Sequence, residues 1–330
     1  MSTQNQGSRV NSTHHPTPEH FQFLLVENFS HLAFSCAVEP LRISNLVSKQ
    51  ELYRWSFASE NGEFARASNG TETRVAHTFA DACDADTIFV LSGLGVQSAA
   101  TSSLIASIRR GRAHGARIGA LCSGAYILAE AGMLDGQKAA IHWHYHDSFM
   151  EEFPQVGLSR SVFVAEAPII TASGGTATAD LMLFLIGQTH GQELATEVAD
   201  QMVYNAVRNA DASQRVSLQS RHGIRNEHLA RAIQWMTDNI DDPSPPSAIA
   251  HEIGVSGRQL ERLFGRYLSC SPKKFYLDLR LQKAQRLLVQ TDMSVTEIAF
   301  ATGFNSPTHF TKTYRAHFGV SPKDQKHKIE

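Results

Sequence analysis

The spacing of apolar and polar positions changes regularly along the first two thirds of the chain. Short runs rich in β-branched and aromatic residues predict buried strands. These runs are Phe21–Glu27, Tyr53–Ser59, Thr87–Ser92 and Arg117–Cys122, with shorter ones near Val162–Ala165 and Ile169–Ala172. The stretches between them have helical spacing, at about Ser30–Ser48, Val96–His114, Ser123–Ala131 and Thr178–His190. Strands that alternate with helices predict a mainly parallel sheet covered by helices on both faces.

The last third of the chain repeats one pattern after 49 residues. The first copy contains Ala250 and Gly254, and the second contains Ala299 and Gly303. A small residue four positions before a glycine suits a tight helix-turn-helix. The small side chain lets two helices approach, and glycine adopts a positive φ at little cost. The repeat therefore predicts an all-helical region with two helix-turn-helix units.

Serine marks the expected helix starts in both copies. Ser256 with Gln259, and Ser294 with Glu297, have the spacing of a capping box. Ser306 is followed by proline, as a helix cap often is.

The second helix of each unit is predicted to enter DNA. In the later unit this helix runs from about Ser306 to Phe318, with Phe310, Tyr314 and Phe318 as its buried stripe. Polar side chains off the apolar stripe of each helix are expected to contact DNA. These candidates are Arg258, Gln259, Glu261, Arg262, Arg266, Ser306, Thr308, His309, Thr311, Lys312 and Arg315.

A further helix lies between the two units. Ser271 caps it, and Leu277, Leu281, Ala284 and Leu288 follow helical spacing. A helix of this kind would hold both recognition helices at a fixed separation. They could then enter successive major grooves on one DNA face, about 34 Å apart.

Residues from about Ala230 to Pro322 resemble the DNA-binding domain of AraC/XylS-family transcription regulators. The segment SVTEIAFATGFNSPTHFTKTYRAHFGVSP matches that family's second-unit signature almost throughout. The resemblance implies binding to double-stranded promoter DNA and contact with RNA polymerase. The alternative left open by the repeat is a helical dimerisation or adaptor domain.

Charge agrees with this division of the chain. Residues 221–330 carry 16 Lys and Arg against 11 Asp and Glu, whereas residues 1–220 carry 14 against 21. A mildly basic region on an acidic body suits contact with phosphates through one face.

Composition sets further bounds on the protein. Its 330 residues suit two domains. The scattered cysteines, Cys36, Cys83, Cys122 and Cys270, argue against a disulfide framework or zinc site and fit a reducing cytosol. The polar N-terminus lacks the apolar core of a signal peptide, and no apolar run is long enough to span a bilayer. We expect a cytoplasmic protein that does not enter the membrane.

One turn of the first region carries candidate chemistry. Cys122 lies among the small residues of Gly119–Gly124, between a predicted strand and a predicted helix. This is the setting of a nucleophile elbow, and the following helix N-terminus is expected to favour thiolate over thiol. His142, in the segment AAIHWHYH, is a candidate base. The ordinary interpretations are a small residue in a tight turn and a pocket histidine.

The setting of Cys122 and His142 resembles the DJ-1/PfpI branch of class I glutamine amidotransferase-like domains, over roughly residues 21–200. The resemblance implies a flavodoxin-like α/β fold and places the loop that begins Ser92-Gly93 near the cysteine. In that branch an acidic residue from the first helix region approaches the cysteine. Here that position falls near Ala33, which is not acidic. Without that partner we expect a vestigial elbow and no catalysis.

The combination of both regions resembles bacterial regulators that sense arginine, carnitine or glycine betaine. The segments FSHLAFSCAVEPLRISN, HWHYH and SGGTATADLML are similar to that group. The resemblance implies a transcription regulator that responds to a small nitrogenous metabolite. We expect a homodimeric activator, without a cofactor, that binds an amino acid or quaternary amine. The candidate ligand-binding residues are Glu39, Gly93, Cys122, His142 and Trp143.

Two features beside His142 also have ordinary explanations. His142, His144 and His146 alternate as in a strand, but no carboxylate or cysteine follows at metal-ligand spacing, so no metal site is expected. Trp143 would form a cation–π wall for a quaternary amine if it faced a pocket. If it faces away it belongs to the core, and the sequence slightly favours the core.

The expected organisation is a disordered tail (1–20), a DJ-1/PfpI-like ligand-sensing domain (21–204), a linker (205–228) and an AraC-type DNA-binding domain (229–330). The competing function is a cysteine-dependent hydrolase or amidase of the DJ-1/PfpI type with a DNA-binding tail. A structural protein that only binds DNA is a third interpretation, which leaves the first domain unused.

Overall fold

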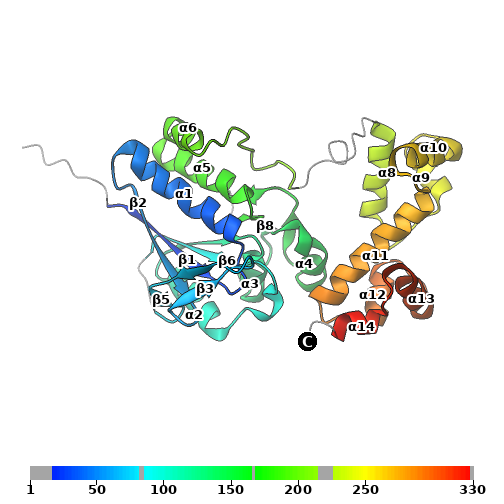
Figure 1. Cartoon of the computed structure of the whole chain (residues 1–330), viewed down its shortest axis with the longest axis horizontal. Coiled ribbons are helices and arrows are strands. Elements are labelled where there is room, and N and C mark those ends of the chain that lie inside the picture. The colour runs from blue at the N-terminus through cyan, green and yellow to red at the C-terminus, as the bar shows by residue number, and fades with distance from the viewer. Residues whose placement is uncertain (1–16, 82–84, 166–167, 215–225, 328–330) are drawn as a thin grey trace, which may run out of the picture.

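Two packed regions make up the structure, a computed structural model that describes residues 17–81, 85–165, 168–214 and 226–327 (Figure 1). The first region, up to residue 214, is built on one large sheet, and the second region, from residue 226, is helical. Cys83, most of the expected tail and about half of the expected linker lie outside the described residues. Within those ranges, no helix combines the length and apolarity needed to cross a bilayer.

The central sheet has seven strands within the described ranges, in the order β10-β11-β7-β6-β1-β2-β5. These strands are β1 (Glu19–Leu25), β2 (Tyr53–Ser59), β5 (His77–Thr78), β6 (Thr87–Leu91), β7 (Arg117–Leu121), β10 (Phe163–Val164) and β11 (Ile169–Ala172). Neighbouring strands are parallel except β10 with β11. The predicted mainly parallel, flavodoxin-like sheet is confirmed. Two short pairs flank it, β3 (Phe64–Arg66) with β4 (Glu72–Arg74) and β8 (Lys138–Ala140) with β9 (Gly157–Ser159).

Helices cover both faces of the sheet because its strands are apolar on both sides. In β1, Phe21, Phe23 and Leu25 pack in one core and Leu24 packs in the other. The first layer contains α1 (His31–Ser48), α5 (Ala177–His190) and α6 (Gln192–Gln201). The second layer contains α2 (Ser102–Ala113), α3 (Gly124–Glu130) and α4 (His146–Glu152).

The prediction of one helix over Val96–His114 is wrong at its start. The chain forms a short 3-10 turn, η1 (Val96–Ser98), before α2 begins. The physical reason is a cap: the Thr101 hydroxyl accepts a hydrogen bond from the Leu104 N–H at 3.3 Å, and so fixes the helix start there.

The order of the strands reverses between β1 and β6, where open α/β sheets usually leave a ligand crevice. Here the loops that follow β1 and β6 contact each other. Phe29 pairs with Gly93, and the Leu94 N–H donates to the Asn28 carbonyl at 3.1 Å. A Cβ atom on Gly93 would lie 2.2 Å from the Asn28 oxygen. Glycine at position 93 is therefore required for the two loops to meet.

The second region is a chain of helices with two apolar cores. The helices are α8 (Glu227–Asp238), α9 (Pro246–Glu252), α10 (Gly257–Leu268), α11 (Pro272–Gln290), α12 (Val295–Ala301), α13 (Pro307–Phe318) and α14 (Pro322–His327). One core joins α8, α9 and α10 to the start of α11, and the other joins α12 and α13 to its end. Because α11 belongs to both cores, it links the two helix-turn-helix units rigidly. Gly254 and Gly303 have φ values of +76° and +75°, as the repeat predicts.

Serine begins the helices at the predicted positions. The side chains of Ser256, Ser294 and Ser306 each accept a hydrogen bond from the backbone three residues later. Ser294 and Glu297 form the full capping box. At Ser256 the bond from the Gln259 backbone is present, at 3.2 Å. The helix predicted from about Ser306 to Phe318 is confirmed as α13, which starts after its cap at Ser306 and ends at Phe318.

Candidate functional site

The two recognition helices, α10 and α13, pack at opposite ends of α11, and α13 lies on the side of α11 away from α4 of the first region (Figure 1). On α10 the apolar face is buried, whereas Arg258, Glu261, Arg262 and Arg266 are exposed. Three of these four side chains are cationic. The exposed face of α10 therefore offers positive charge where DNA phosphates and base edges would meet it.

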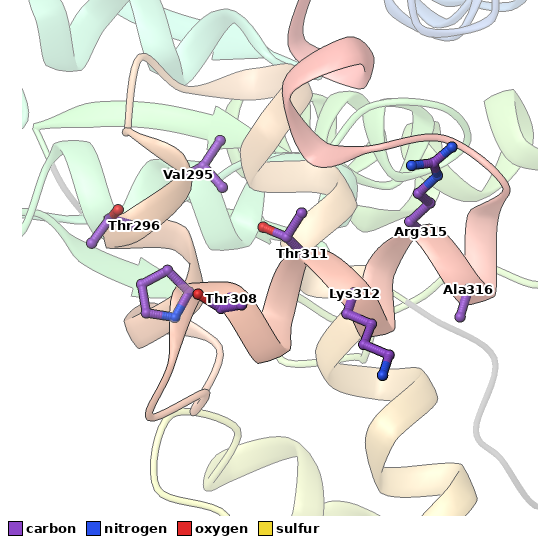
Figure 2. A pocket seen from close by; sticks show the side chains of 8 residues that line it. Val295, Thr296, Thr308, Thr311, Lys312, Arg315 and Ala316 are labelled. Atoms are coloured by element: carbon purple, nitrogen blue, oxygen red, sulfur yellow. The ribbon is translucent and has the colours of Figure 1, made fainter.

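An open groove of about 820 Å³ lies between α12 and α13. Figure 2 shows Thr308, Thr311, Lys312 and Arg315 along this face of α13, beside Thr296 of α12. Lys312 and Arg315 are exposed, while Phe310 and Tyr314 are buried beneath them. The structure thus gathers four predicted DNA contacts of the second unit on one surface.

Three of the four remaining predicted DNA contacts, Ser306, Arg266 and His309, have side-chain partners within the protein. The Ser306 hydroxyl caps α13, and Arg266 lies 5.4 Å from the centre of the Tyr267 ring. The exposed His309 ring lies 5.8 Å from the Phe304 ring. Gln259 is half-buried. Contact with DNA through Ser306, Arg266 or His309 would therefore add to these contacts or replace them.

The turn at Cys122 has the backbone of a nucleophile elbow. It follows β7 directly, Cys122 has a φ of +62°, and α3 begins two residues later. The Cys122 N–H donates to the Ala172 carbonyl at 2.9 Å, so the turn is anchored to β11. A positive φ strains a residue with a Cβ atom, and such strain is found mainly at functional positions.

Gly174 and its neighbours cover the sulfur of Cys122. Gly174 has a φ of +85°, and a Cβ atom there would lie 2.9 Å from Cys122 Sγ. Cys122 is accordingly only 7% exposed. Sequence reasoning did not assign this role to Gly174, although it noted the surrounding segment SGGTATADLML.

The expectation that the helix N-terminus favours the thiolate is wrong. Burial raises the pKa of the Cys122 thiol to about 11 and outweighs the opposing hydrogen bond from the Ser123 backbone. The helix that follows has only seven residues, and the desolvation of the buried Cys122 thiolate outweighs the stabilisation that so short a helix dipole provides.

We predict that Cys122 alkylates slowly at neutral pH. With a pKa near 11, its thiolate fraction at pH 8 is roughly 100-fold below that of a thiol with the ordinary value. The rate constant for iodoacetamide at Cys122, followed by peptide mass spectrometry, should therefore rise with pH up to about 11. A fast rate that is flat between pH 6 and 8 would show that the helix terminus dominates after all.

The segment after β8 joins the elbow to the neighbouring loop. The His142 N–H donates to the Cys122 carbonyl at 3.1 Å, and the Tyr145 hydroxyl donates to the Gly93 carbonyl at 2.8 Å. The Ser123 hydroxyl donates to the same carbonyl at 2.7 Å. Gly93, Cys122 and His142 are therefore brought together, as the site hypothesis expects.

The strand-like interpretation of the three histidines is wrong. Residues Trp143–Tyr145 form a 3-10 turn, η2, because the Tyr145 N–H closes it on the His142 carbonyl at 2.9 Å. Trp143 is half-buried, 5.4 Å from the His142 ring, rather than in the core. Among the described residues, no group of three or more His, Cys, Asp or Glu side chains is arranged to hold a metal ion.

Burial lowers the pKa of His142 to about 4, with smaller effects from His144 and His146. His142 is therefore neutral at pH 7. Since the unfolded chain binds this proton near pH 6.5, stability is full above that pH and is lost as pH falls toward 4. We expect the melting temperature to fall between pH 7 and 5, less steeply in His142→Gln. The exposed His114→Gln serves as control, and equal slopes in all three proteins would contradict the prediction.

Glu39 pairs with a residue of its own helix rather than with the elbow group, which consists of Gly93, Cys122 and His142. It is half-exposed on α1 and forms an ion pair with Arg42 at 2.7 Å. Ala33, where the catalytic acid of the DJ-1/PfpI pattern is expected, is fully buried in the same apolar core as Cys122. The structure therefore places an apolar methyl group where the resemblance requires a carboxylate.

A polar cluster that the sequence did not reveal lies between α5 and the segment after α6. The buried Asp180 carboxylate accepts from Arg208 at 2.7 Å and from the Tyr204 hydroxyl at 2.9 Å. It borders a cavity of about 730 Å³ that Phe163 and Phe184 also line. The cluster fastens residues 204–208 to the first region. The sequence predicted a linker from residue 205 onward, so the start of that prediction is wrong.

Comparison with known proteins agrees with both halves of the structure. Residues 23–188 match the DJ-1/PfpI family, and residues 249–327 match a helix-turn-helix domain. The transcriptional regulator GbdR of Pseudomonas aeruginosa is 39% identical over 94% of this chain and 84% of its own length. The regulator CdhR of the same species is 40% identical over 93% of this chain and 91% of its own length.

A solved structure shares the fold of the first region. The AraC family transcriptional regulator from Pseudomonas putida has 26% identity and a TM-score of 0.52, and covers 56% of this chain and all of that one. Both relatives are named as transcriptional regulators, and the helix-turn-helix match agrees with that role. The chain belongs to the DNA-binding transcription regulators in which a DJ-1/PfpI domain precedes an AraC-type helix-turn-helix domain.

Proposed function

We propose that this regulator activates transcription in the cytoplasm in response to a small nitrogenous metabolite, and that it works as a homodimer in contact with RNA polymerase. We place the sensing domain at about residues 21–214, because Arg208 pairs with Asp180 and the Ala212 carbonyl accepts from Val162, and the DNA-binding domain at about residues 229–330. The observation that carries the proposal is the pair of recognition helices with exposed cations, α10 and α13, which the shared helix α11 links. Two helices so placed suit two adjacent major grooves of promoter DNA.

The proposed DNA contacts come from both recognition helices. The exposed cations and the polar groups beside them suit phosphates and base edges. The proposed residues are Arg258, Gln259, Glu261, Arg262, Arg266, Ser306, Thr308, His309, Thr311, Lys312 and Arg315.

The proposed metabolite site is the elbow group, Gly93, Cys122 and His142, together with Trp143 and Glu39. The half-buried indole of Trp143 supplies an aromatic face, and Glu39 supplies a carboxylate. Both features suit a ligand with a cationic nitrogen. A metabolite that uses Glu39 must compete with Arg42, which now pairs with it.

A screen of L-arginine, L-carnitine and glycine betaine tests the sensing function. A ligand stabilises the folded protein in proportion to the logarithm of its concentration over its Kd, so the melting temperature should rise with concentration. Stabilisation should persist in Cys122→Ser. Amine or ammonia released by the wild type and lost in Cys122→Ser would contradict the non-catalytic role.

We predict that Glu39→Ala abolishes metabolite-induced transcription while Cys122→Ser retains much of it. Loss of a charge-assisted contact costs about 1.5–3 kcal/mol, or roughly tenfold or more in affinity. The matched control is Arg42→Ala, which frees Glu39 and should preserve or strengthen the response. A reporter gene on the target promoter measures all three variants. An undiminished response in Glu39→Ala would exclude Glu39 from the site.

A further inference from the structure

The first region contacts the second through α4, which packs against the last turns of α11. Arg286 lies 2.6 Å from Asp147, and Lys283 lies 3.7 Å from Glu151. The contact thus sets two acidic side chains of α4 against two basic side chains of α11. Asp147 is 18% exposed and Arg286 is 27% exposed, so water screens their attraction only in part.

Two hydrogen bonds of the buried Gln290 side chain also belong to this contact between the regions. The Ser148 hydroxyl donates to Gln290 Oε1 at 3.2 Å, and Gln290 Nε2 donates to the His144 carbonyl at 3.2 Å. Ser148 is fully buried and Gln290 is 4% exposed. One end of the Gln290 amide therefore bonds Ser148 within α4, and the other bonds His144 just before that helix.

The same short segment also contacts the elbow. His142 donates to the Cys122 carbonyl and Tyr145 donates to the Gly93 carbonyl, whereas His144 accepts from Gln290. Residues 142–148 therefore touch the cysteine turn, the Gly93 loop and α11 within two turns of chain. A displacement of this segment at the elbow would be felt directly at α11.

The part of α11 that α4 contacts supports the second helix-turn-helix unit. Ala284, Leu287 and Leu288 alternate with the junction residues Lys283 and Arg286 and pack in the core with α12 and α13. A shift of α4 would therefore act on the orientation of α13.

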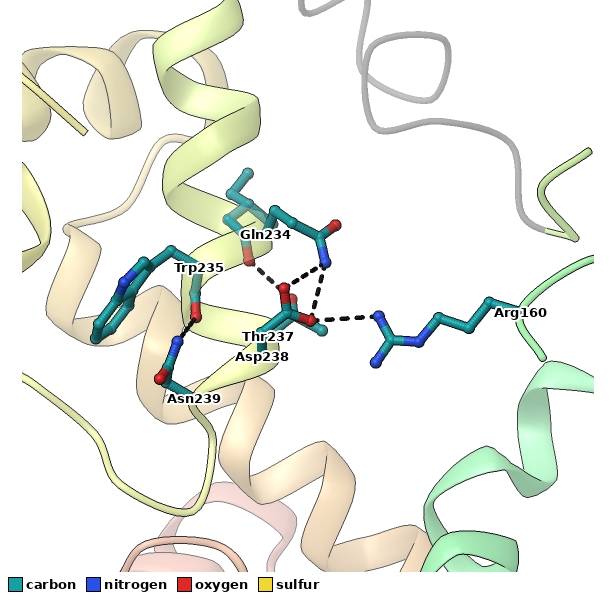
Figure 3. A network of polar contacts seen from close by, with 7 residues as sticks. Arg160, Gln234, Trp235, Thr237, Asp238 and Asn239 are labelled. Carbon is teal, nitrogen blue, oxygen red and sulfur yellow. Dashed lines mark hydrogen bonds and ion pairs between the residues drawn. The ribbon is translucent and has the colours of Figure 1, made fainter. Parts of the chain in front are cut away.

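A second, weaker contact reaches the first unit. Figure 3 shows Arg160 beside Asp238 of α8, at 3.3 Å, with Gln234 on the same carboxylate. Both partners of this ion pair are about half exposed, so it contributes little. The main connection between the regions is the one through α4.

We propose that α4 transmits the state of the elbow to the second helix-turn-helix unit, and that the Asp147–Arg286 pair keeps it engaged on α11. This inference rests on the proposed sensing function and names its route. Coupling between two sites is reciprocal, so DNA bound at α13 must also change the elbow. Cys122 is a native reporter of that change, because its labelling rate depends on how closely the elbow and Gly174 cover the sulfur.

The test measures N-ethylmaleimide labelling of Cys122 at pH 8.5 by peptide mass spectrometry, with and without a duplex selected from random DNA by the full-length protein. In the wild type, saturating duplex should slow labelling by about fivefold or more. Asp147→Arg places a like charge opposite Arg286. This variant should still bind the duplex, but its Cys122 should be labelled at the same rate with and without duplex. The charge-swapped Asp147→Arg with Arg286→Asp should recover the slowing.

Two further variants make the result decisive. Asp135→Arg reverses an exposed charge of the same region that lies outside α4 and should behave as wild type. Asp147→Asn removes the charge without reversing it and should lose most of the slowing. Full slowing in both Asp147 variants with duplex bound, or no slowing in the wild type, would overturn the inference. The labelling test adds no metabolite. A screen that finds no stabilising metabolite would therefore not contradict this inference, and an unchanged labelling rate would not contradict metabolite binding.

Discussion

A variant in which Arg262 and Lys312 are both alanine is expected to lose sequence-specific DNA binding almost completely. Arg262 is exposed on α10, and Lys312 is exposed beside the groove on α13. A side chain that reads a base contributes about 1–3 kcal/mol of discrimination. The two positions lie in different units, so their losses should add. The combined effect is about 2–6 kcal/mol, or more than 30-fold in the specific Kd.

The measurement is a fluorescence anisotropy titration of a selected duplex at fixed salt, repeated with a scrambled duplex. Arg54→Ala, an exposed cation of β2 in the first region, is the control for a change in net charge and should leave Kd nearly unchanged. A phosphate contact would instead weaken both duplexes alike and lower the salt dependence. If Arg262→Ala and Lys312→Ala each bind as tightly as wild type, docking through α10 and α13 is wrong.

Replacing Gly303 by alanine is expected to unfold or badly distort the second helix-turn-helix unit. A Cβ atom there would lie 2.6 Å from Pro243 Cδ and 2.7 Å from the Ile240 carbonyl oxygen. Neither the proline ring nor the backbone can rotate away. The clash adds to the cost of a positive φ for a residue with a Cβ atom, which is about 1–2 kcal/mol. Overpacking of this kind costs about 1–3 kcal/mol more.

Gly254→Ala is the matched control for Gly303→Ala. Gly254 holds the corresponding turn with nearly the same φ, but a Cβ atom there would meet nothing within 4 Å. Its substitution should cost only the backbone strain. Urea unfolding of the two variants should therefore separate them by about 1–3 kcal/mol. Equal losses of stability would show that the turn glycines matter through φ alone.

The helix-turn-helix region could be predicted almost to the residue because its signals are local. Ser294 with Glu297, and the stripe that contains Phe310 and Tyr314, each lie within one or two helical turns. A cap or stripe acts through neighbours in sequence, so the sequence displays the interaction itself. The sequence does not show that a Cβ atom would clash at Gly303 but not at Gly254. The clash involves Pro243, which is 60 residues from Gly303 in the chain.

The elbow shows the opposite case. The turn at Cys122 was predictable from small residues between a strand and a helix, but the thiol pKa was not. Gly174 covers the sulfur from a distant loop, and burial then outweighs the helix N-terminus. The Asp147–Arg286 contact joins residues 139 positions apart, and neither residue has a pattern that points to the other. Features decided by such distant contacts require the fold.

The helix α11, which both helix-turn-helix units share, constrains how the DNA sequences that the regulator binds can evolve. A substitution in either recognised segment weakens one contact and can be repaired by another substitution. A gain or loss of one base pair between the segments is different, because it turns one of them by roughly 35° about the DNA axis. A continuous 19-residue helix packed in two cores cannot twist to follow. Target sites in a genome should therefore drift in sequence while their internal spacing stays constant.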